Sequence, residues 1–172
     1  MTMKSCSAAV LALSLAACAG GEPRPEAPVP TPAPTRDWVA EIRAQAASLD
    51  NAVVVEPLSD PAVADLKRLA QSAEAAGDFS MARTGYERAL ALRPEDPVAW
   101  QALAELSLRA GQWKAAASEA QRSYDLGPRS GPLCLRNWLT IRAARIEIGD
   151  TFNLPSAEAQ AAACAVKPLI RM

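Results

Sequence analysis

The sequence predicts an all-α protein built as a short solenoid of helical hairpins. Alanine is abundant and aromatic residues make up only 5% of the 172 residues, a composition that favours helices over sheets. Apolar residues recur at helical spacing along most of the chain after its first 36 residues. Part of this pattern then returns after 34 residues, and a period of that length is typical of stacked helical units.

The chain begins with a segment typical of export signals, which we assign to residues 1–17. Lys4 gives this segment a positive start, and the apolar run from Ala8 to Leu15 is shorter than the roughly 20 residues that span a bilayer. The run ends in Leu-Ala-Ala-Cys at residues 15–18, which resembles the lipobox of bacterial lipoproteins. This resemblance implies cleavage before Cys18 and acylation of its thiol. An ordinary cleaved signal followed by a chance cysteine is the alternative.

Residues 18–36 are expected to form the lipidated N-terminus and a disordered, proline-rich linker. These residues show no apolar period and are rich in proline, which favours extended chain. The segment is therefore predicted to be a tether that holds the domain away from the membrane. Ala19 stands where Gram-negative lipoproteins retained in the inner membrane usually have aspartate, so the resemblance implies the outer membrane, facing the periplasm. The linker prolines are Pro23, Pro25, Pro28, Pro30, Pro32 and Pro34.

The cysteine count becomes informative once the signal is assigned. Cys6 leaves with the signal and Cys18 is acylated, so Cys134 and Cys164 remain. An even pair of cysteines in an exported protein predicts a disulfide, with two free buried thiols as the alternative. A metal site is disfavoured because the chain contains no histidine and these two cysteines are far apart in sequence.

Residues 37–62 are expected to form an N-terminal helix and an extended segment. Asp37 is a suitable capping residue for the helix. Four apolar residues follow it at helical spacing, which predicts one buried face. These residues are Trp38, Ile42, Ala46 and Leu49.

The apolar, β-branched run at residues 52–55 ends before Pro57 and interrupts the helical pattern. No second strand is evident for it to pair with, so we expect extended chain packed on the domain rather than a strand. Asp60 and Pro61 then form an N-cap followed by proline at the first helical position.

Two units of equal length follow, at residues 63–96 and 97–130. Each is expected to contain two antiparallel helices. A glycine permits the turn between them, a small alanine lets them approach closely, an aromatic residue fills the gap at the start of the second helix, and a proline ends the unit. The matched pairs are Gly77 and Gly111, Phe79 and Trp113, Ala82 and Ala116, and Pro94 and Pro128.

This pattern resembles the tetratricopeptide repeat over about residues 63–130. The chain departs from the family where a usual aromatic residue of the first helix is Ala73 or Ser107, and where Ala120 and Ser123 stand in the second unit. The resemblance implies a noncatalytic scaffold whose first helices line a partner-binding groove. The implied groove residues are Lys67, Gln71, Glu74, Gln101, Glu105, Leu108, Arg109, Leu135, Leu139 and Arg142.

Residues 131–168 are expected to form a third, divergent hairpin. Its first helix ends near Gly149, and after an atypical loop Ser156 is expected to cap an alanine-rich second helix. In an antiparallel hairpin the start of the first helix lies beside the end of the second, which brings Cys134 close to Cys164. A disulfide there would stabilise the terminal unit, on which no further repeat stacks.

The function predicted is that of a noncatalytic, lipid-anchored adaptor for an unknown periplasmic or envelope protein. The absence of histidine excludes Ser-His and Cys-His nucleophile systems, and we find no phosphate loop, zinc motif or cofactor site. A net charge of −1 gives no general attraction to nucleic acid. Envelope-complex or pilus assembly and the regulation of cell-wall enzymes are suitable processes. Two alternatives stay open: a self-associating or wall-bridging spacer, and a groove filled by residues 37–58 of the same chain.

Overall fold

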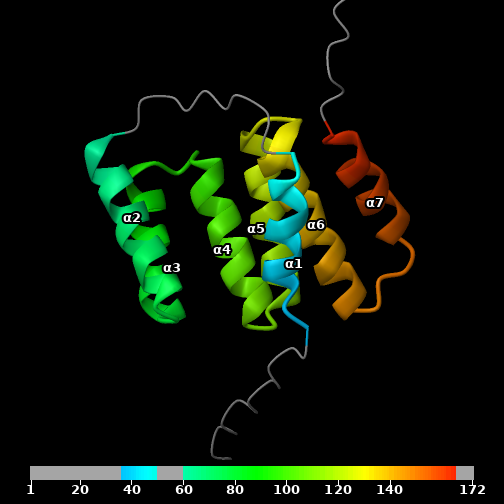
Figure 1. Cartoon of the computed structure of the whole chain (residues 1–172), viewed down its shortest axis with the longest axis horizontal. Helices are drawn as coiled ribbons and strands as arrows, with labels where there is room; N and C mark the ends of the chain where they lie inside the picture. Colours follow the sequence, from blue (N-terminus) through cyan, green and yellow to red (C-terminus); the bar gives the residue numbers. More distant parts are fainter. Residues whose placement is uncertain (1–35, 50–59, 166–172) are drawn as a thin grey trace, which may run out of the picture. The chain divides into compact units, whose positions relative to one another are not determined.

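The computed structural model describes residues 36–49 and 60–165. Within these ranges all regular structure is α-helical, which confirms the predicted fold class. Figure 1 shows the helices lying side by side. They are α1 (Trp38–Ala47), α2 (Pro61–Ala75), α3 (Phe79–Leu92), α4 (Pro97–Arg109), α5 (Trp113–Leu126), α6 (Gly131–Glu147) and α7 (Leu154–Ala163).

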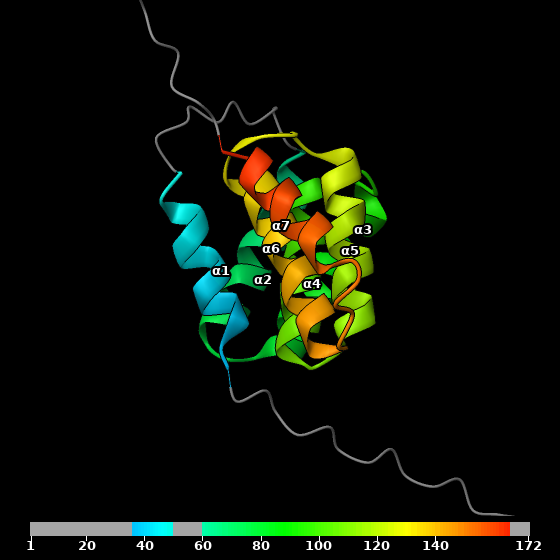
Figure 2. The ribbon, with the colours of Figure 1, turned by 90° about the vertical axis from the view of Figure 1, so that its right-hand side faces the viewer.

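Six of the helices form three hairpins that pack in sequence order. α2 packs on α3, α4 on α5 and α6 on α7, while α3 contacts α4 and α5 contacts α6. α1 does not follow this order, because its main contacts are with α4 and α6. Figure 2 shows α1 on one side of the hairpins, with α3 and α5 on the opposite side. The N-terminal helix therefore covers the first helices of the second and third hairpins.

The first two helices start at the residues that the sequence predicts. The Asp37 carboxylate accepts the backbone N–H of Ala40 at 3.0 Å and so caps α1. The Asp60 carboxylate accepts the N–H of Ala62 at 2.8 Å, with Pro61 at the first helical position. Local capping chemistry thus fixes both boundaries.

The predicted hairpin turns are also present. Gly77 and Gly111 adopt φ of 80° and 71°, the left-handed region that a Cβ atom disfavours. Ala82 and Ala116, which follow these turns by five residues, both have 0% exposure. The two hairpins therefore repeat in three dimensions the features that repeat in the sequence.

Phe79 differs from its predicted role. We expected it to fill a gap at the start of α3, yet it is 40% exposed, whereas Trp113 at the matching position of α5 is partly buried against an apolar cluster. Trp113 packs against a cluster to which α5, α6 and α7 contribute, whereas the face of the Phe79 ring lies against the Arg109 guanidinium, 4.9 Å from the ring centre. The ring of Phe79 is therefore left at the surface.

The third hairpin starts its second helix earlier than predicted. α7 begins at Leu154 with Asn153 in the N-cap position, so the assignment of Ser156 as the cap is wrong. Pro155 lies within the first turn, where a helix needs no backbone N–H from it. Pro155 therefore belongs to α7 and not to the loop that precedes it.

A disulfide joins Cys134 of α6 to Cys164 at the end of α7, as the cysteine count predicts. Their Cα atoms are 5.6 Å apart, and each residue is 1% exposed. The backbone N–H of Gly131 also donates to the carbonyl of Cys164 at 2.8 Å. The last hairpin is thus closed by a covalent bond next to a backbone hydrogen bond.

Buried apolar side chains of the described residues form two clusters. One combines α2, α3 and α4, and the other combines α1 with α4, α5, α6 and α7. α1 contributes Trp38, Val39 and Ile42 to the second cluster, with exposures of 5%, 2% and 2%. Burial of large apolar side chains is the main stabilising term in folding, so α1 is held as part of the packed structure.

Several predictions fall outside the described residues. These include the signal segment, Cys18, the proline-rich linker and the apolar run at residues 52–55. Within the described ranges, every helix is too short or too polar to cross a bilayer. The anchor and the tether therefore stay predictions from the sequence.

The closest approach of α2 and α3 gives a test of the packing. A Cβ atom added at Gly85 would lie 2.8 Å from the Cβ of Ala70, a side chain too short to move aside. Although Gly→Ala inside a helix normally stabilises by about 0.5–1 kcal/mol, Gly85→Ala is expected to lower the free energy of unfolding by about 1–2 kcal/mol through overpacking. Urea unfolding measures this change. Thr84→Ala, at the exposed neighbouring position, is the control and is expected to be neutral or slightly stabilising.

Candidate protein-binding groove

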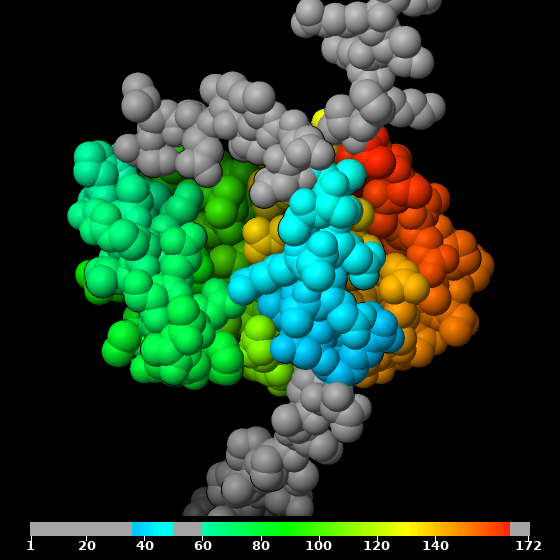
Figure 3. Space-filling model, in the orientation of Figure 1, coloured from blue at the N-terminus to red at the C-terminus, as the bar shows by residue number. Residues whose placement is uncertain are grey.

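The first helices of the three hairpins, α2, α4 and α6, line one face, which we call the groove. Figure 3 shows α1 lying over this face, with a hollow left between α1 and α2. A pocket of about 510 Å³ occupies this open part. It is lined by Arg43, Gln71, Glu74, Ala75, Gly77, Phe79, Tyr86, Val98, Ala102, Arg109 and Arg136.

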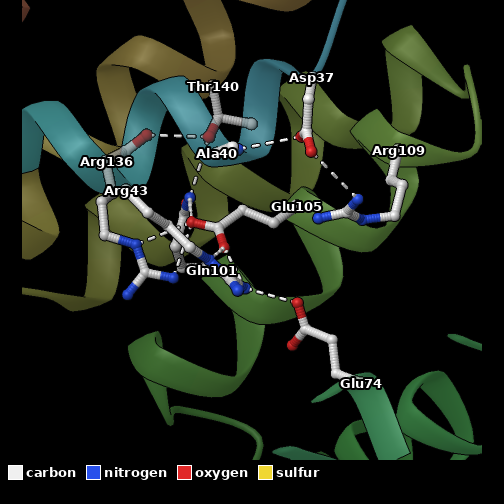
Figure 4. Close-up of polar contacts among 9 residues, drawn as sticks. All are labelled: Asp37, Ala40, Arg43, Glu74, Gln101, Glu105, Arg109, Arg136 and Thr140. Carbon is white, nitrogen blue, oxygen red and sulfur yellow. Dashed lines mark hydrogen bonds and ion pairs between the residues drawn. The ribbon is translucent and has the colours of Figure 1, made fainter. Parts of the chain in front are cut away.

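Glu105 of α4 is the centre of a polar network beneath α1 (Figure 4). Its side chain has 0% exposure and accepts Nε of Arg43 from α1 and Nε of Arg136 from α6, each at 2.7 Å. The Gln101 amide donates to Glu105 at 3.0 Å and to the Thr140 hydroxyl at 2.9 Å. Burying a charge is costly unless it is paired and hydrogen-bonded, so these donors make the position of Glu105 possible.

The N-terminal end of α1 makes further polar contacts with the groove helices. The indole N–H of Trp38 donates to Glu147 of α6 at 2.6 Å. Asp37 lies 3.6 Å from a guanidinium nitrogen of Arg109 at the end of α4. The Arg109 guanidinium also stacks on the ring of Phe79, 4.9 Å from its centre, and its Nε is buried without a hydrogen-bond partner among the described residues. Arg109 therefore connects α1 to the rim of the pocket.

Arg43 belongs both to the network and to the pocket. Besides Glu105, its guanidinium contacts Glu74 of α2 at 2.7 Å. Burial alone lowers the pKa of Arg43, but the charges of Glu105 and Glu74 outweigh it and raise the pKa above its ordinary value. On the opposite wall, burial and the nearby Glu74 carboxylate raise the pKa of Tyr86 to about 12. Both side chains thus keep one protonation state at neutral pH.

The ten residues predicted to line the groove divide into three groups. Three of them line the pocket: Gln71, Glu74 and Arg109. Five lie in the part that α1 covers, either in the polar network or in the apolar cluster that α1 shares: Gln101, Glu105, Leu108, Leu135 and Leu139. In this part four of the five side chains are buried and Leu135 is partly buried.

The other two predicted residues pair with neighbouring elements. Lys67 bonds Asp96, the buried N-cap residue of α4, at 2.9 Å. Arg142 bonds Glu158 of α7 at 3.0 Å. Neither residue is among those that line the pocket.

One alternative from the sequence is that residues 37–58 of the same chain fill the groove, and the structure tests it for residues 37–49. Residues 38–47, as α1, lie over α4 and α6, whereas residues 50–58 lie outside the described ranges. Sequence reasoning missed Arg43, Phe79 and Arg136 as pocket residues. Arg43 precedes the repeats, and Arg136 is one residue away from the predicted Leu135, so the repeat pattern gave no signal for either.

Comparison with known families identifies part of this architecture. Residues 63–106 match the tetratricopeptide repeat. The matched segment covers α2, α3 and most of α4, about a quarter of the chain. Comparison with curated proteins gave no match. The repeat is a scaffold for binding other proteins, so the match supports an interaction role for the groove.

The described residues offer the groove no metal chemistry. No three histidine, cysteine, aspartate or glutamate side chains in these ranges are grouped to hold an ion. The polar groups of the groove instead bond one another as arginine–carboxylate and amide–carboxylate pairs. These pairs are made within the chain, between α1, α4 and α6.

The pKa of Tyr86 gives a test of how well the pocket is formed. Its folded-state value of about 12 exceeds the ordinary value of about 10, so its stabilising contribution is complete below pH 10 and is lost as the pH rises toward 12. The free energy of unfolding is expected to fall more steeply across this range for the parent than for Tyr86→Phe. Urea unfolding at several pH values measures the difference. Identical slopes for the two proteins would contradict the burial of this phenol.

Proposed function

We propose that this protein is a noncatalytic adaptor of the bacterial cell envelope that binds a segment of a client protein in the groove. The pocket between α1 and α2 carries the proposal, because it is the part of the groove that the described residues leave open. Its volume of about 510 Å³ is in the range of sites that hold a small ligand or a few side chains. The tetratricopeptide repeat match supports a protein as the ligand.

The lining of the pocket suits a peptide segment. Val98 and Ala102 of α4 are apolar, and Phe79 adds an aromatic surface at the edge. Gln71 and Arg109 offer donors that can pair with backbone carbonyls or with an acidic side chain. One apolar side chain flanked by hydrogen-bonding groups would satisfy both parts of this surface.

The lipobox-like motif supports a location for this adaptor. Lipidation of Cys18 would hold the chain on the periplasmic side of the outer membrane, and the proline-rich segment would extend the repeats from the surface. Clients in envelope-complex or pilus assembly, or among cell-wall enzymes, are within reach of such a tether.

Site-specific crosslinking tests the client site. A photo-crosslinking amino acid at Gln71, which is exposed and lines the pocket, is expected to capture a defined client in intact cells. The same group at Arg88, exposed on α3 and not among the lining residues, is the matched control and is expected to capture none of it. Capture is measured as a shifted band identified by mass spectrometry.

Capture of the client must also depend on the residues that line the pocket. Arg109→Ala in the Gln71 crosslinking protein removes a donor from the pocket rim and is expected to reduce the captured band at least about tenfold. Equal capture from positions 71 and 88, or capture unaffected by Arg109→Ala, would contradict a client site in the groove.

The anchor is tested separately. Cys18→Ser removes the proposed acylation and cleavage site and is expected either to release the protein into the soluble periplasmic fraction or to accumulate as the uncleaved precursor. Fractionation with immunodetection measures this, and Cys6→Ser is the control that is expected to leave membrane association unchanged. A Cys18→Ser protein that is cleaved and stays on the membrane as the parent does would overturn the anchor.

A further inference from the structure

α1 shows what the covered part of the groove recognises. It is a ten-residue amphipathic helix whose buried residues occupy spaced positions on one face: Trp38, Val39, Ile42 and Ala46. Next to this face, Arg43 reaches the buried Glu105 of α4 and Glu74 of α2. The surface over α4 and α6 is therefore complementary to an apolar helix face with one adjoining cation.

The helical form of α1 depends on this surface. Isolated helices shorter than about 12–15 residues are marginal in water, and α1 has ten residues. Its N-cap bond from Asp37 satisfies one backbone donor, but the burial that stabilises the helix comes from α4 and α6. α1 is thus ordered by docking and is helical as long as it stays docked.

The pairing of the buried charge in the groove depends less on α1 than the helical form of α1 depends on the groove. Glu105 is the fully buried charge of the network, and Arg43 is only one of its partners. When Arg43 leaves, Arg136 of α6 still donates to Glu105 at 2.7 Å and Gln101 at 3.0 Å. Departure of α1 therefore leaves Glu105 paired, while Glu74, whose side chain is 10% exposed when α1 is docked, loses its bond to Arg43.

The pocket adjoins the same site. Arg43 forms part of its lining, so a client bound in the pocket contacts α1 directly. A client chain that extends from the pocket along α4 and α6 must occupy the space of α1. The open pocket and the covered surface are two parts of one groove.

We infer that the surface over α4 and α6 is a receptor for a client helix with the pattern Trp-Val-x-x-Ile-Arg-x-x-Ala, and that α1 is the resident helix which the client replaces. This inference rests on the proposed function and deepens it, because it names the element of the client that binds. α1 supplies the pattern at residues 38–46. Binding of the client helix is reduced by the fraction of molecules in which α1 is docked.

A peptide that copies α1 tests the inference. The probe is a fluorescent peptide of residues 36–49, and the receptor is the full chain with Cys18→Ser in every sample so that no membrane is needed. Ile42→Glu places a carboxylate at a position that is 2% exposed, so it is expected to undock α1 and to strengthen peptide binding at least about tenfold, measured by fluorescence anisotropy. Binding no tighter than that of the parent would overturn the inference.

Two further variants serve as controls, one for the effect of the added charge and one for the place where the peptide binds. Ala44→Glu adds the same charge at an exposed position of α1 and is expected to bind the peptide as weakly as the parent. Leu139→Glu, added to the Ile42→Glu protein, alters the cluster that receives α1 and is expected to abolish binding. Unchanged binding after Leu139→Glu would place the peptide elsewhere and would also overturn the inference.

Hydrogen exchange of the parent provides a measurement without destabilising variants. If α1 undocks as a unit, its amides exchange faster than those of α4 and α6. Equal protection of the three helices would show that α1 leaves only on global unfolding and would exclude it as an exchangeable helix. Neither measurement involves the client, so their failure leaves the crosslink from position 71 to judge the proposed function.

Discussion

The buried carboxylate of Glu105 is the interaction on which the arrangement of the groove depends. It has no solvent exposure, yet two guanidinium groups and an amide from three helices reach it. Arg43 extends the network to Glu74, so α1, α2, α4 and α6 are joined through one charge. An apolar surface alone would accept a helix in several registers, whereas a buried charge with fixed partners favours the register that pairs it.

The two ends of the hairpin series are held by different means, and this determines where the structure can change. The last hairpin is closed by the disulfide between Cys134 and Cys164. α1 contacts the same apolar cluster but is held there only by packing and by exchangeable polar pairs such as Asp37 with Arg109. The covalent bond therefore keeps α6 on α7 whether or not α1 is docked.

The sequence predicted those features that depend on nearby residues or on the repeat period. Asp37 and Asp60 cap helices through amides two or three residues away, and Gly77 and Gly111 share a turn conformation because they share a place in the repeat. The bond from Arg43 to Glu105 joins residues 62 apart and links a helix outside the repeats to one inside them. No period relates such residues, so only the packed structure brings them together.

In the proposed exchange, Arg43 couples the binding of a client to the position of α1. Its guanidinium lines the pocket and at the same time bonds Glu105 beneath α1. A client that only fills the pocket gains the contact with Arg43 and so favours the docked state. A client that brings its own helix gains the surface over α4 and α6 and favours the undocked state. Since a ligand shifts an equilibrium only by its difference in affinity for the two states, the length and helicity of the client segment decide which state it selects.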